Sequence, residues 1–377
     1  MRQNRITFSS YPKRPFHSKY RPTHFDEIVG QEHVVSFFKN VILNQRLSFA
    51  YLFIGKHGLG KTTMARIIAK VLNCSKPYNG DACDQCVNCV NISLGKSFDV
   101  HEINAALNTG VDNIRYIIEK IQLSSVHSLY KICIIDEVHM LSLNAFNALL
   151  KVLEEPPKNV VFILATTEIK KIPNTITSRC HKLFFLPVDE MNLASSISKI
   201  VWIEQGSITN KALLHIVDSS EGSFRDAINL VDMLMTNDQN ITESNCFFLS
   251  TEVPYSVSNL FFSYLLSGNI ISILEMYHYI RSKKWLGDSL LKQIQKMLEN
   301  DIVNCSTSSL KSQYLISFWQ LLSKYQSHNL TMISTFSSFL FELTNIVLSS
   351  STLKKSNNCV DKKKIPSFIK IEDIYIC

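Results

Sequence analysis

No apolar run in the sequence is long enough, and free enough of polar residues, to span a membrane. The best candidate, residues 333–348, is interrupted by Glu342, Asn345 and several Ser and Thr residues, which is typical of a buried amphipathic helix. The N-terminus also lacks the apolar segment of a secretory signal. These absences exclude a membrane from the expected partners.

Cysteine is scarce, with 10 residues among 377, which excludes a small domain held together by disulfides. Hydrophobic residues make up 46% and charged residues 19% of the chain, so apolar cores can form and a mainly disordered chain is excluded. The length suffices for two or three domains. Lys and Arg exceed Asp and Glu by 39 to 32, a moderate excess that suggests an anionic partner.

Acidic residues are absent before Asp26. We therefore interpret residues 1–18 as a basic N-terminal arm. An organelle transit peptide is the alternative, but Pro12 and Pro15 would interrupt its amphipathic helix. The basic residues before Asp26 are Arg2, Arg5, Lys13, Arg14, Lys19 and Arg21.

The first half of the sequence alternates apolar runs of strand length with helical patterns. Residues 49–55, 131–136 and 160–166 are predicted strands, and residues 61–72 and 144–155 are predicted helices. This alternation predicts a parallel sheet that is covered by helices on both faces.

Helical patterns dominate after residue 187, and we find no internal repeat. We place an α/β domain at residues 19–187, a small helical domain at residues 188–242 and a larger helical domain at residues 253–350. Residues 351–377 are rich in Lys and are expected to form a loose tail.

The segment from Gly55 to Thr62 matches the phosphate-binding pattern G-x-x-x-x-G-K-[ST] in full. It follows a predicted strand and opens a predicted helix, which is the context of a P-loop. We expect Lys61 to contact the β- and γ-phosphates of a nucleotide and the Thr62 hydroxyl to ligate Mg²⁺. The expected nucleotide-binding residues here are Gly55, Lys56, His57, Gly58, Leu59, Gly60, Lys61, Thr62 and Thr63.

Two acids close the next apolar strand. Asp136 ends the run at residues 131–136, and Glu137 follows it. An acid at the carboxyl end of a strand beside the P-loop strand is placed to hold Mg²⁺. Glu137 is then the candidate that polarises the attacking water. Taken alone, the pair would be ordinary chemistry at the start of a helix.

Four cysteines form the pattern C-x8-C-x2-C-x2-C at Cys74, Cys83, Cys86 and Cys89. Four thiolates predict a closed tetrahedral zinc site with a structural role, which would fix an insertion at residues 74–96. Free thiols, a redox pair and an iron–sulfur cluster are the alternatives. The cluster is disfavoured because its usual trailing Cys-Pro is missing.

Two arginines lie outside these motifs. Arg179 follows the third predicted strand after a polar loop, and Arg225 begins a helix of the small helical domain. From the residues alone, a surface ion pair is the expected role of each. A functional interpretation depends on the family that the sequence resembles.

Further segments accompany these motifs in a fixed order along the chain. They are KYRP at 19–22, IVGQEH at 28–33, DEVHML at 136–141, FNALLK at 146–151, LEEPP at 153–157, ATT at 165–167, SRC at 178–180 and GSFRDA at 222–227. With the P-loop and the cysteines, they resemble the gamma/tau family, the AAA+ ATPase subunits of the bacterial DNA polymerase III clamp loader. The resemblance covers residues 19–235, and its most discriminating part is the cysteine insertion.

The resemblance implies an α/β AAA+ P-loop module with a parallel sheet, followed by a small helical lid and an all-α C-terminal collar domain. Thr167 (or its neighbour Thr166) would sense the γ-phosphate, and Arg225 would be a second sensor on the lid. Arg179 would be an arginine finger that enters the ATP site of the neighbouring subunit in trans. The residues that would line the adenine pocket are Tyr20, Arg21, Pro22, Val29 and Gly30.

The implied function is a DNA-stimulated ATPase that opens a sliding clamp and loads it on primed DNA, with ATP, Mg²⁺ and Zn²⁺ as cofactors. Expected partners are other copies of itself, the delta and delta-prime subunits, the beta clamp and primer-template DNA. We expect the bacterial cytoplasm as the location, with an organelle interior as the second alternative. The alternative functions are a non-catalytic loader scaffold, against which the intact P-loop argues, and a AAA+ branch-migration motor, against which the cysteine insertion argues.

The sequence departs from the family pattern at two positions. Asn104 and Leu107 stand where family members usually have Asp and Ser. We expect these changes to leave the ATP chemistry untouched and to affect local contacts with DNA or with other subunits. Because the sequence ends after the third domain, we expect a gamma-length chain without the long extension of tau forms.

Overall fold

The computed structural model describes residues 13–107, 110–122, 125, 128–249, 253, 255–267, 269–283, 287–304 and 320. The chain divides into two compact units between residues 246 and 247. Most of the predicted arm, the end of the predicted collar domain and the predicted tail lie outside the described residues. The domain boundaries expected from the sequence stay predictions.

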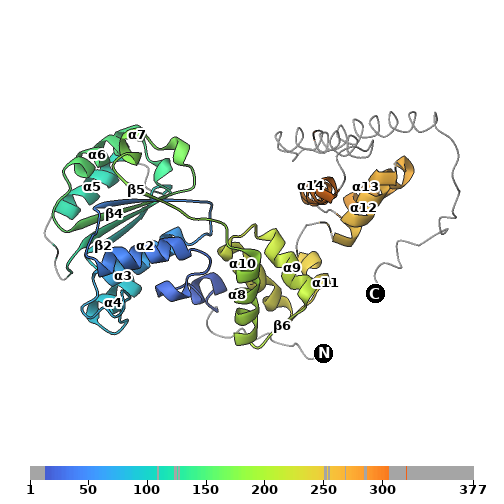
Figure 1. Ribbon diagram of the computed structural model, residues 1–377, viewed down its shortest axis with the longest axis horizontal. Coiled ribbons are helices and arrows are strands. Elements are labelled where there is room, and N and C mark those ends of the chain that lie inside the picture. Colours follow the sequence, from blue (N-terminus) through green and yellow to red (C-terminus); the bar gives the residue numbers. More distant parts are fainter. Residues whose placement is uncertain are drawn as a thin grey trace, which may run out of the picture. The chain divides into compact units, whose positions relative to one another are not determined.

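A parallel sheet forms the centre of the first unit (Figure 1). Its strand order is β2-β3-β4-β1-β5, and every neighbouring pair is parallel. The three central strands are those expected from the sequence, which confirms the predicted α/β module. The strands are β1 (Ala50–Ile54), β2 (Val100–Asn104), β3 (Lys131–Asp136), β4 (Val160–Thr166) and β5 (His181–Phe184).

The two strands at the edges of the sheet carry no apolar run. In β2 only Ile103 is buried, and β5 has no buried residue. Each residue of β1 and of β4 is buried, by contrast. An edge strand is covered on fewer sides, so polar residues are accommodated there, and a search for apolar runs does not find it.

Helices cover both faces of the sheet, as predicted (Figure 1). Strand β1 contributes to both cores, because successive side chains of a strand point to opposite faces. Leu52 packs into the core with α5 and α6, whereas Tyr51 and Phe53 pack into the core with α2 and α3. The helices are α2 (Glu32–Leu43), α3 (Lys61–Leu72) and α4 (Val87–Ser93) on one face, and α5 (Val111–Gln122), α6 (Leu143–Glu154) and α7 (Asn174–Thr177) on the other.

Single turns of 3-10 helix occupy three of the connections between these elements. They are η1 (Phe25–Glu27), η2 (Val138–Met140) and η3 (Ile169–Lys171). The second of them directly follows the acid pair, and the third lies between β4 and α7. Both therefore shape the edge of the sheet where the strand ends meet.

The rest of the first unit is mainly helical, with one short two-stranded sheet, β6-β7. Capping side chains begin three of its helices, because Asp189, Thr209 and Ser223 each accept a hydrogen bond from a backbone N–H in the first turn. A short helix, α1 (Phe16–Lys19), packs against α10 and donates from the Phe16 N–H to Asp232 Oδ2 at 3.0 Å. The elements are α8 (Glu190–Ile203), β6 (Ser207–Ile208), α9 (Asn210–Ser219), α10 (Phe224–Asn237), β7 (Asn240–Ile241) and α11 (Glu243–Leu249).

The second unit is helical where it is described. It contains α12 (Tyr255–Ser267), α13 (Ile270–Ser282) and α14 (Gly287–Asn304). Their shared core includes Phe261 and Leu290, which are fully buried. Among all helices of the described residues, none is long and apolar enough to cross a membrane.

Candidate nucleotide-binding site

A cavity of about 280 Å³ lies between the P-loop, the segment that follows α1, and α10. It brings together most of the residues that the sequence motifs singled out, although they lie far apart in the chain. The predicted residues that line it are Tyr20, Arg21, Pro22, Val29, His57, Gly58, Leu59, Gly60, Lys61, Thr62, Thr63, Asp136, Glu137 and Arg225.

The P-loop connects β1 to α3. Gly58 and Gly60 have φ angles of 74° and 92°, in the left-handed region that favours glycine. Lys61 begins α3 and is 5% exposed. Its Nζ donates hydrogen bonds to the carbonyl oxygens of Gly55 at 2.7 Å and of Lys56 at 2.8 Å.

Lys61 also lies in the field of the acid pair. Burial lowers the pKa of the Lys61 ammonium, and the carboxylates of Glu137 and Asp136 oppose this change. The lysine therefore combines a desolvated position with two nearby negative charges. The desolvated position strengthens the attraction of the ammonium for an added phosphate, whereas the two carboxylates compete with the phosphate for this charge.

Thr62 and Asp136 are in direct contact, as expected for two groups that ligate one ion. Thr62 Oγ1 donates to Asp136 Oδ2 at 2.6 Å. The other carboxylate oxygen, Asp136 Oδ1, accepts a hydrogen bond from the Glu137 N–H at 3.0 Å. One hydroxyl and one carboxylate at the end of the cavity form an oxygen donor set that fits Mg²⁺.

Glu137 begins the turn η2 with a φ angle of 51°, so the chain reverses sharply after β3. Its side chain is 14% exposed. Thr167 Oγ1 donates to Glu137 Oε2 at 3.3 Å, and His57 Nδ1 of the P-loop lies 3.4 Å from Glu137 Oε1. The carboxylate is therefore contacted from the residue that follows β4 and from the P-loop.

The two neighbouring threonines at the end of β4 have different environments. Thr166 is fully buried, and its Oγ1 accepts from the Glu168 N–H at 3.0 Å. Thr167 reaches the acid pair instead, although it is not among the residues that line the cavity. Of the two candidates for the γ-phosphate sensor, Thr167 is the one that contacts Glu137.

The start of α10 closes the cavity over the P-loop. Arg225 lines the cavity, and a Cβ atom added to Gly58 would lie 2.0 Å from Ser223 Oγ and 3.3 Å from Arg225 Cβ. The P-loop and the helical part of the unit also form an ion pair, with Lys56 Nζ 3.3 Å from Glu221 Oε2.

The other end of the cavity is built by the segment after α1. Tyr20 OH donates to Glu204 Oε1, and Arg21 Nε donates to Thr63 Oγ1 at 3.2 Å. Burial lowers the pKa of Arg21, and the nearby positive charge of Arg66 adds to this effect. These contacts connect the segment to both the helical part and the α/β part of the unit.

Sequence reasoning missed several lining residues, namely His17, Ser18, Ile28, Val188, Phe224 and Ile228. Phe224 and Ile228 lie one position before and three positions after Arg225 on α10, so helical spacing could have indicated them. Val188 packs against Gly30, whose φ is 73° and whose added Cβ would lie 3.0 Å from Val188 Cγ1. No pattern in the sequence indicates such a contact between distant segments.

Arg179 is not brought to the cavity of its own chain. It follows α7, where its guanidinium donates to Glu154 Oε1 at 2.8 Å and to the Thr175 carbonyl oxygen at 2.7 Å. Its side chain is 35% exposed. Of the two departures from the family pattern, Asn104 pairs in register with Asp136, and Leu107 is 83% exposed.

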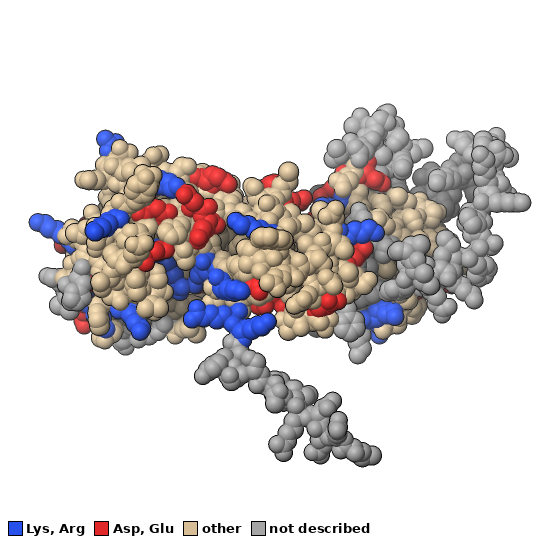
Figure 2. All heavy atoms as spheres, turned by 90° about the horizontal axis from the view of Figure 1, so that it is seen from below, with Lys and Arg blue, Asp and Glu red and all other residues tan. Residues whose placement is uncertain are grey.

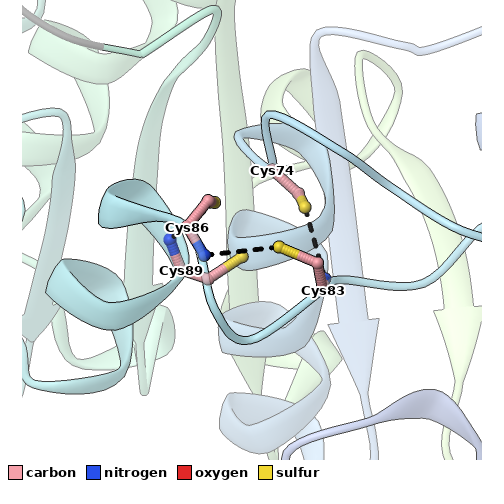
Figure 3. A group of neighbouring side chains, drawn as sticks. All are labelled: Cys74, Cys83, Cys86 and Cys89. Carbon is pink, nitrogen blue, oxygen red and sulfur yellow. Dashed lines mark hydrogen bonds between the residues drawn. The ribbon is translucent and has the colours of Figure 1, made fainter.

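The four cysteines of the insertion come together from the end of α3, the loop that follows it and the start of α4 (Figure 3). Their Sγ atoms all lie within 4.8 Å of one another. A tetrahedral zinc ion with Zn–S bonds of about 2.3 Å separates its sulfurs by roughly 3.8 Å, so the donor set fits zinc. The cysteines that the structure describes are free thiols and not disulfides.

Backbone N–H groups point at three of these sulfurs. The N–H groups of Cys83, Cys86 and Cys89 donate to the Sγ atoms of Cys74, Cys83 and Cys86 at 3.3, 3.4 and 3.4 Å. Burial opposes ionisation of Cys86, but backbone N–H groups, including that of Ser75, and neighbouring thiols outweigh it and lower its pKa to about 6. Such donors stabilise thiolates, the form that binds metal.

Basic residues also gather on the surface. Figure 2 shows a group of Lys and Arg side chains on one face of the molecule, with Asp and Glu side chains beside them. The moderate positive charge of the sequence is therefore not evenly spread over this face.

The family model and the relatives found by sequence are both subunits of DNA polymerase III. Residues 30–189 match the family model described as "DNA polymerase III, delta subunit". The chain is 45% identical over 217 residues to the DNA polymerase III subunit tau of Bacillus subtilis, covering 58% of this chain and 38% of that protein. It is 38% identical over 249 residues to the DNA polymerase III subunit gamma of Buchnera aphidicola subsp. Schizaphis graminum, covering 66% of this chain and 68% of that protein.

The matched region is therefore limited. The alignment covers 38% of the length of the tau protein of Bacillus subtilis. It covers 61% of the length of the DNA polymerase III subunit gamma of Buchnera aphidicola subsp. Baizongia pistaciae. Among solved structures, the Thermotoga maritima RuvB Holliday junction branch migration motor is similar, with a TM-score of 0.45 and 19% identity over 60% of this chain and 71% of that one.

Proposed function

Because this chain belongs to the gamma/tau family of bacterial DNA polymerase III subunits, we propose that it is an ATPase subunit of a clamp loader. It would use ATP binding and hydrolysis to open a sliding clamp and to load it on primed DNA. The observation that carries the proposal is the convergence of Lys61, Asp136, Glu137 and Arg225 on one cavity.

The cavity would hold ATP with its phosphates on the P-loop. Lys61 would exchange its hydrogen bonds to the P-loop carbonyls for contacts with the β- and γ-phosphates. Thr62 Oγ1 and Asp136 Oδ2, which are 2.6 Å apart, would hold Mg²⁺. The ion neutralises phosphate charge when it is bound. Glu137 would accept a proton from the attacking water.

Two further residues would report the state of the nucleotide. Thr167 contacts Glu137, so it would connect the γ-phosphate to the residue that polarises water. Arg225 lies at the start of α10, so contact with the phosphates would draw the helical lid toward the P-loop. The adenine would lie between the segment at residues 20–22, Val29 and Gly30, where Val188 packs against Gly30.

Hydrolysis would require a second subunit. Arg179 is on the surface, outside the cavity of its own chain and paired with Glu154. We assign it as the arginine finger that enters the ATP site of a neighbouring subunit, where such a residue stabilises the charge of the transition state. The proposed partners are other copies of this chain, the delta and delta-prime subunits, the beta clamp and primer-template DNA.

The cysteine insertion would have a structural role. Four sulfurs leave no open coordination position on a tetrahedral zinc ion. Zinc would therefore stabilise the fold around α4 and would take no part in the hydrolysis of ATP.

The basic side chains on the face in Figure 2 are compatible with a DNA partner.

Steady-state ATP hydrolysis tests the proposal. The full chain would be assembled with delta, delta-prime and the clamp, and turnover would be measured with and without primed DNA. We expect primed DNA to raise turnover, and Glu137→Gln to lower it by about 10²–10⁴-fold while ATP binding persists. An assembly that binds clamp and DNA but hydrolyses no ATP would favour a non-catalytic scaffold.

A further inference from the structure

His139 lies directly behind the acid pair, and the function proposed above does not use it. Its side chain is 7% exposed. Nδ1 lies 3.3 Å from Glu137 Oε2 and 3.1 Å from Thr166 Oγ1. The imidazole therefore contacts residues that follow β3 and residues at the end of β4, two neighbouring strands of the sheet.

The turn η2 explains how the ring reaches this position. Glu137 has left-handed φ, and the Met140 N–H donates to the Glu137 carbonyl oxygen at 2.9 Å. Val138 and Leu141 are buried on either side of the turn. The backbone thereby folds back on the acid pair, and the side chain two residues after Glu137 returns to its carboxylate.

The two ring nitrogens have unequal contacts. Nε2 lies 3.6 Å from Glu168 Oε1, and that carboxylate is already paired with Lys171 Nζ at 2.8 Å. Nδ1 makes the closer contacts, with Glu137 and Thr166. The hydrogen bond that Nδ1 makes in this structure is to Thr166 Oγ1, and the Glu137 carboxylate lies 3.3 Å from the same nitrogen. The tautomer that carries its proton on Nδ1 is the one that can act on Glu137, because a carboxylate only accepts hydrogen bonds.

The carboxylate of Glu137 has few other restraints. Oε2 accepts from the Thr167 hydroxyl at 3.3 Å, and Oε1 faces His57 at 3.4 Å. His57 is 77% exposed at its side chain, so it restrains the carboxylate weakly compared with the buried ring of His139. Without the contact from His139 Nδ1, only the Thr167 hydroxyl would restrain the Glu137 carboxylate on its buried side.

We propose that His139 is a positioning residue for Glu137: its Nδ1–H fixes the carboxylate against the end of β4. The inference rests on the proposed function, in which Glu137 polarises the attacking water. A misplacement of about 1 Å of a reacting group can cost roughly 10²-fold in rate. The loss of this restraint should therefore lower turnover while leaving the binding of ATP intact, since His139 is not among the residues that line the cavity.

Three substitutions of His139 distinguish the role of Nδ1 from that of Nε2. His139→Asn retains an amide nitrogen close to the place of Nδ1, His139→Gln retains one close to the place of Nε2, and His139→Phe retains only the ring. In the full chain assembled with its loader partners and primed DNA, we expect kcat to fall roughly 10- to 100-fold in the Gln and Phe variants. The Asn variant should stay within about threefold of the unsubstituted chain, and KM for ATP should change little in all three.

Control variants distinguish failure of the inference from failure of the proposed function. His278→Gln changes an exposed histidine of α13 and should leave kcat unchanged. If Glu137→Gln abolishes turnover but the Asn and Gln variants of His139 turn over equally, or the Phe variant retains full kcat, the positioning role is overturned. If Glu137→Gln itself retains full turnover, the proposed catalytic role of Glu137 fails.

A structural role for His139 would give a different pattern. Loss of packing would lower the thermal midpoint and would raise KM and lower kcat together, without a preference for Asn over Gln. If His139→Phe does not fold, the comparison of the Asn and Gln variants still decides, because both are polar and differ in where the amide lies. Equal losses in these two would overturn the inference.

Discussion

Replacement of Gly58 by Ala should weaken the contact between the P-loop and the lid. Gly58 has a φ angle of 74°, and the added Cβ would lie 2.0 Å from Ser223 Oγ. This hydroxyl accepts from the Asp226 N–H at 3.3 Å and caps α10. The hydroxyl would have to rotate away, so the substitution would break the cap of the helix that carries Arg225.

The expected cost has two parts. A Cβ in the left-handed region costs about 1–2 kcal/mol, and loss of a serine cap costs about 1 kcal/mol. Gly58→Ala should therefore lower the free energy of unfolding by about 2–3 kcal/mol. Gly60 is the matched control. Its φ is 92° and no atom lies within 4 Å of an added Cβ, so Gly60→Ala would carry only the cost of a Cβ in the left-handed region.

Urea unfolding of the single and double variants tests this reasoning. Ser223→Gly should cost only a few tenths of a kcal/mol, since glycine is tolerated at a helix N-cap. Added to Gly58→Ala, it should restore about 1 kcal/mol of the free energy of unfolding, because it removes the obstructed hydroxyl. Added to Gly60→Ala, it should restore none. A Gly58→Ala/Ser223→Gly variant no more stable than Gly58→Ala alone would refute the reasoning.

Three other substitutions test single roles in the proposed site. Lys61→Ala removes a charged donor to phosphate and should weaken ATP binding by about 10- to 100-fold, measured by titration calorimetry; unchanged affinity would contradict its role. Arg179→Ala should leave the Kd for ATP unchanged and lower DNA-stimulated turnover by about 10³-fold in the assembled loader, and full turnover would exclude the trans finger. Cys89→Ser should release zinc and lower the thermal midpoint, whereas a wild-type chain purified without bound zinc in elemental analysis would contradict the metal assignment.

The central part of the fold could be predicted because buried parallel strands consist of apolar residues. Strands β1, β3 and β4 occupy the middle of the sheet, and each appears in the sequence as an apolar run. The edge strands β2 and β5 are only partly buried and were missed. The helix expected at residues 144–155 begins one residue earlier, at Leu143, because Ser142 accepts from the Ala145 N–H and caps it.

The candidate site was predicted to the extent that its residues form local motifs. The P-loop and the acid pair are each expected to bind one ligand through residues that are close in sequence, so their spacing carries the signal. Val188 and His17 reach the cavity only through packing between distant segments. The contact of His139 with Thr166 likewise depends on the pairing of β3 with β4, which spacing along the chain does not encode.

The most direct test of the proposed function is clamp loading itself. The full chain, assembled with delta, delta-prime and a labelled clamp, would be mixed with primed circular DNA and ATP, and the DNA would be separated to count retained clamps. We predict that ATP gives closed clamps on DNA and that a slowly hydrolysed analogue traps loader, clamp and DNA together. Equal clamp retention with ATP and without nucleotide would contradict an ATP-driven loader.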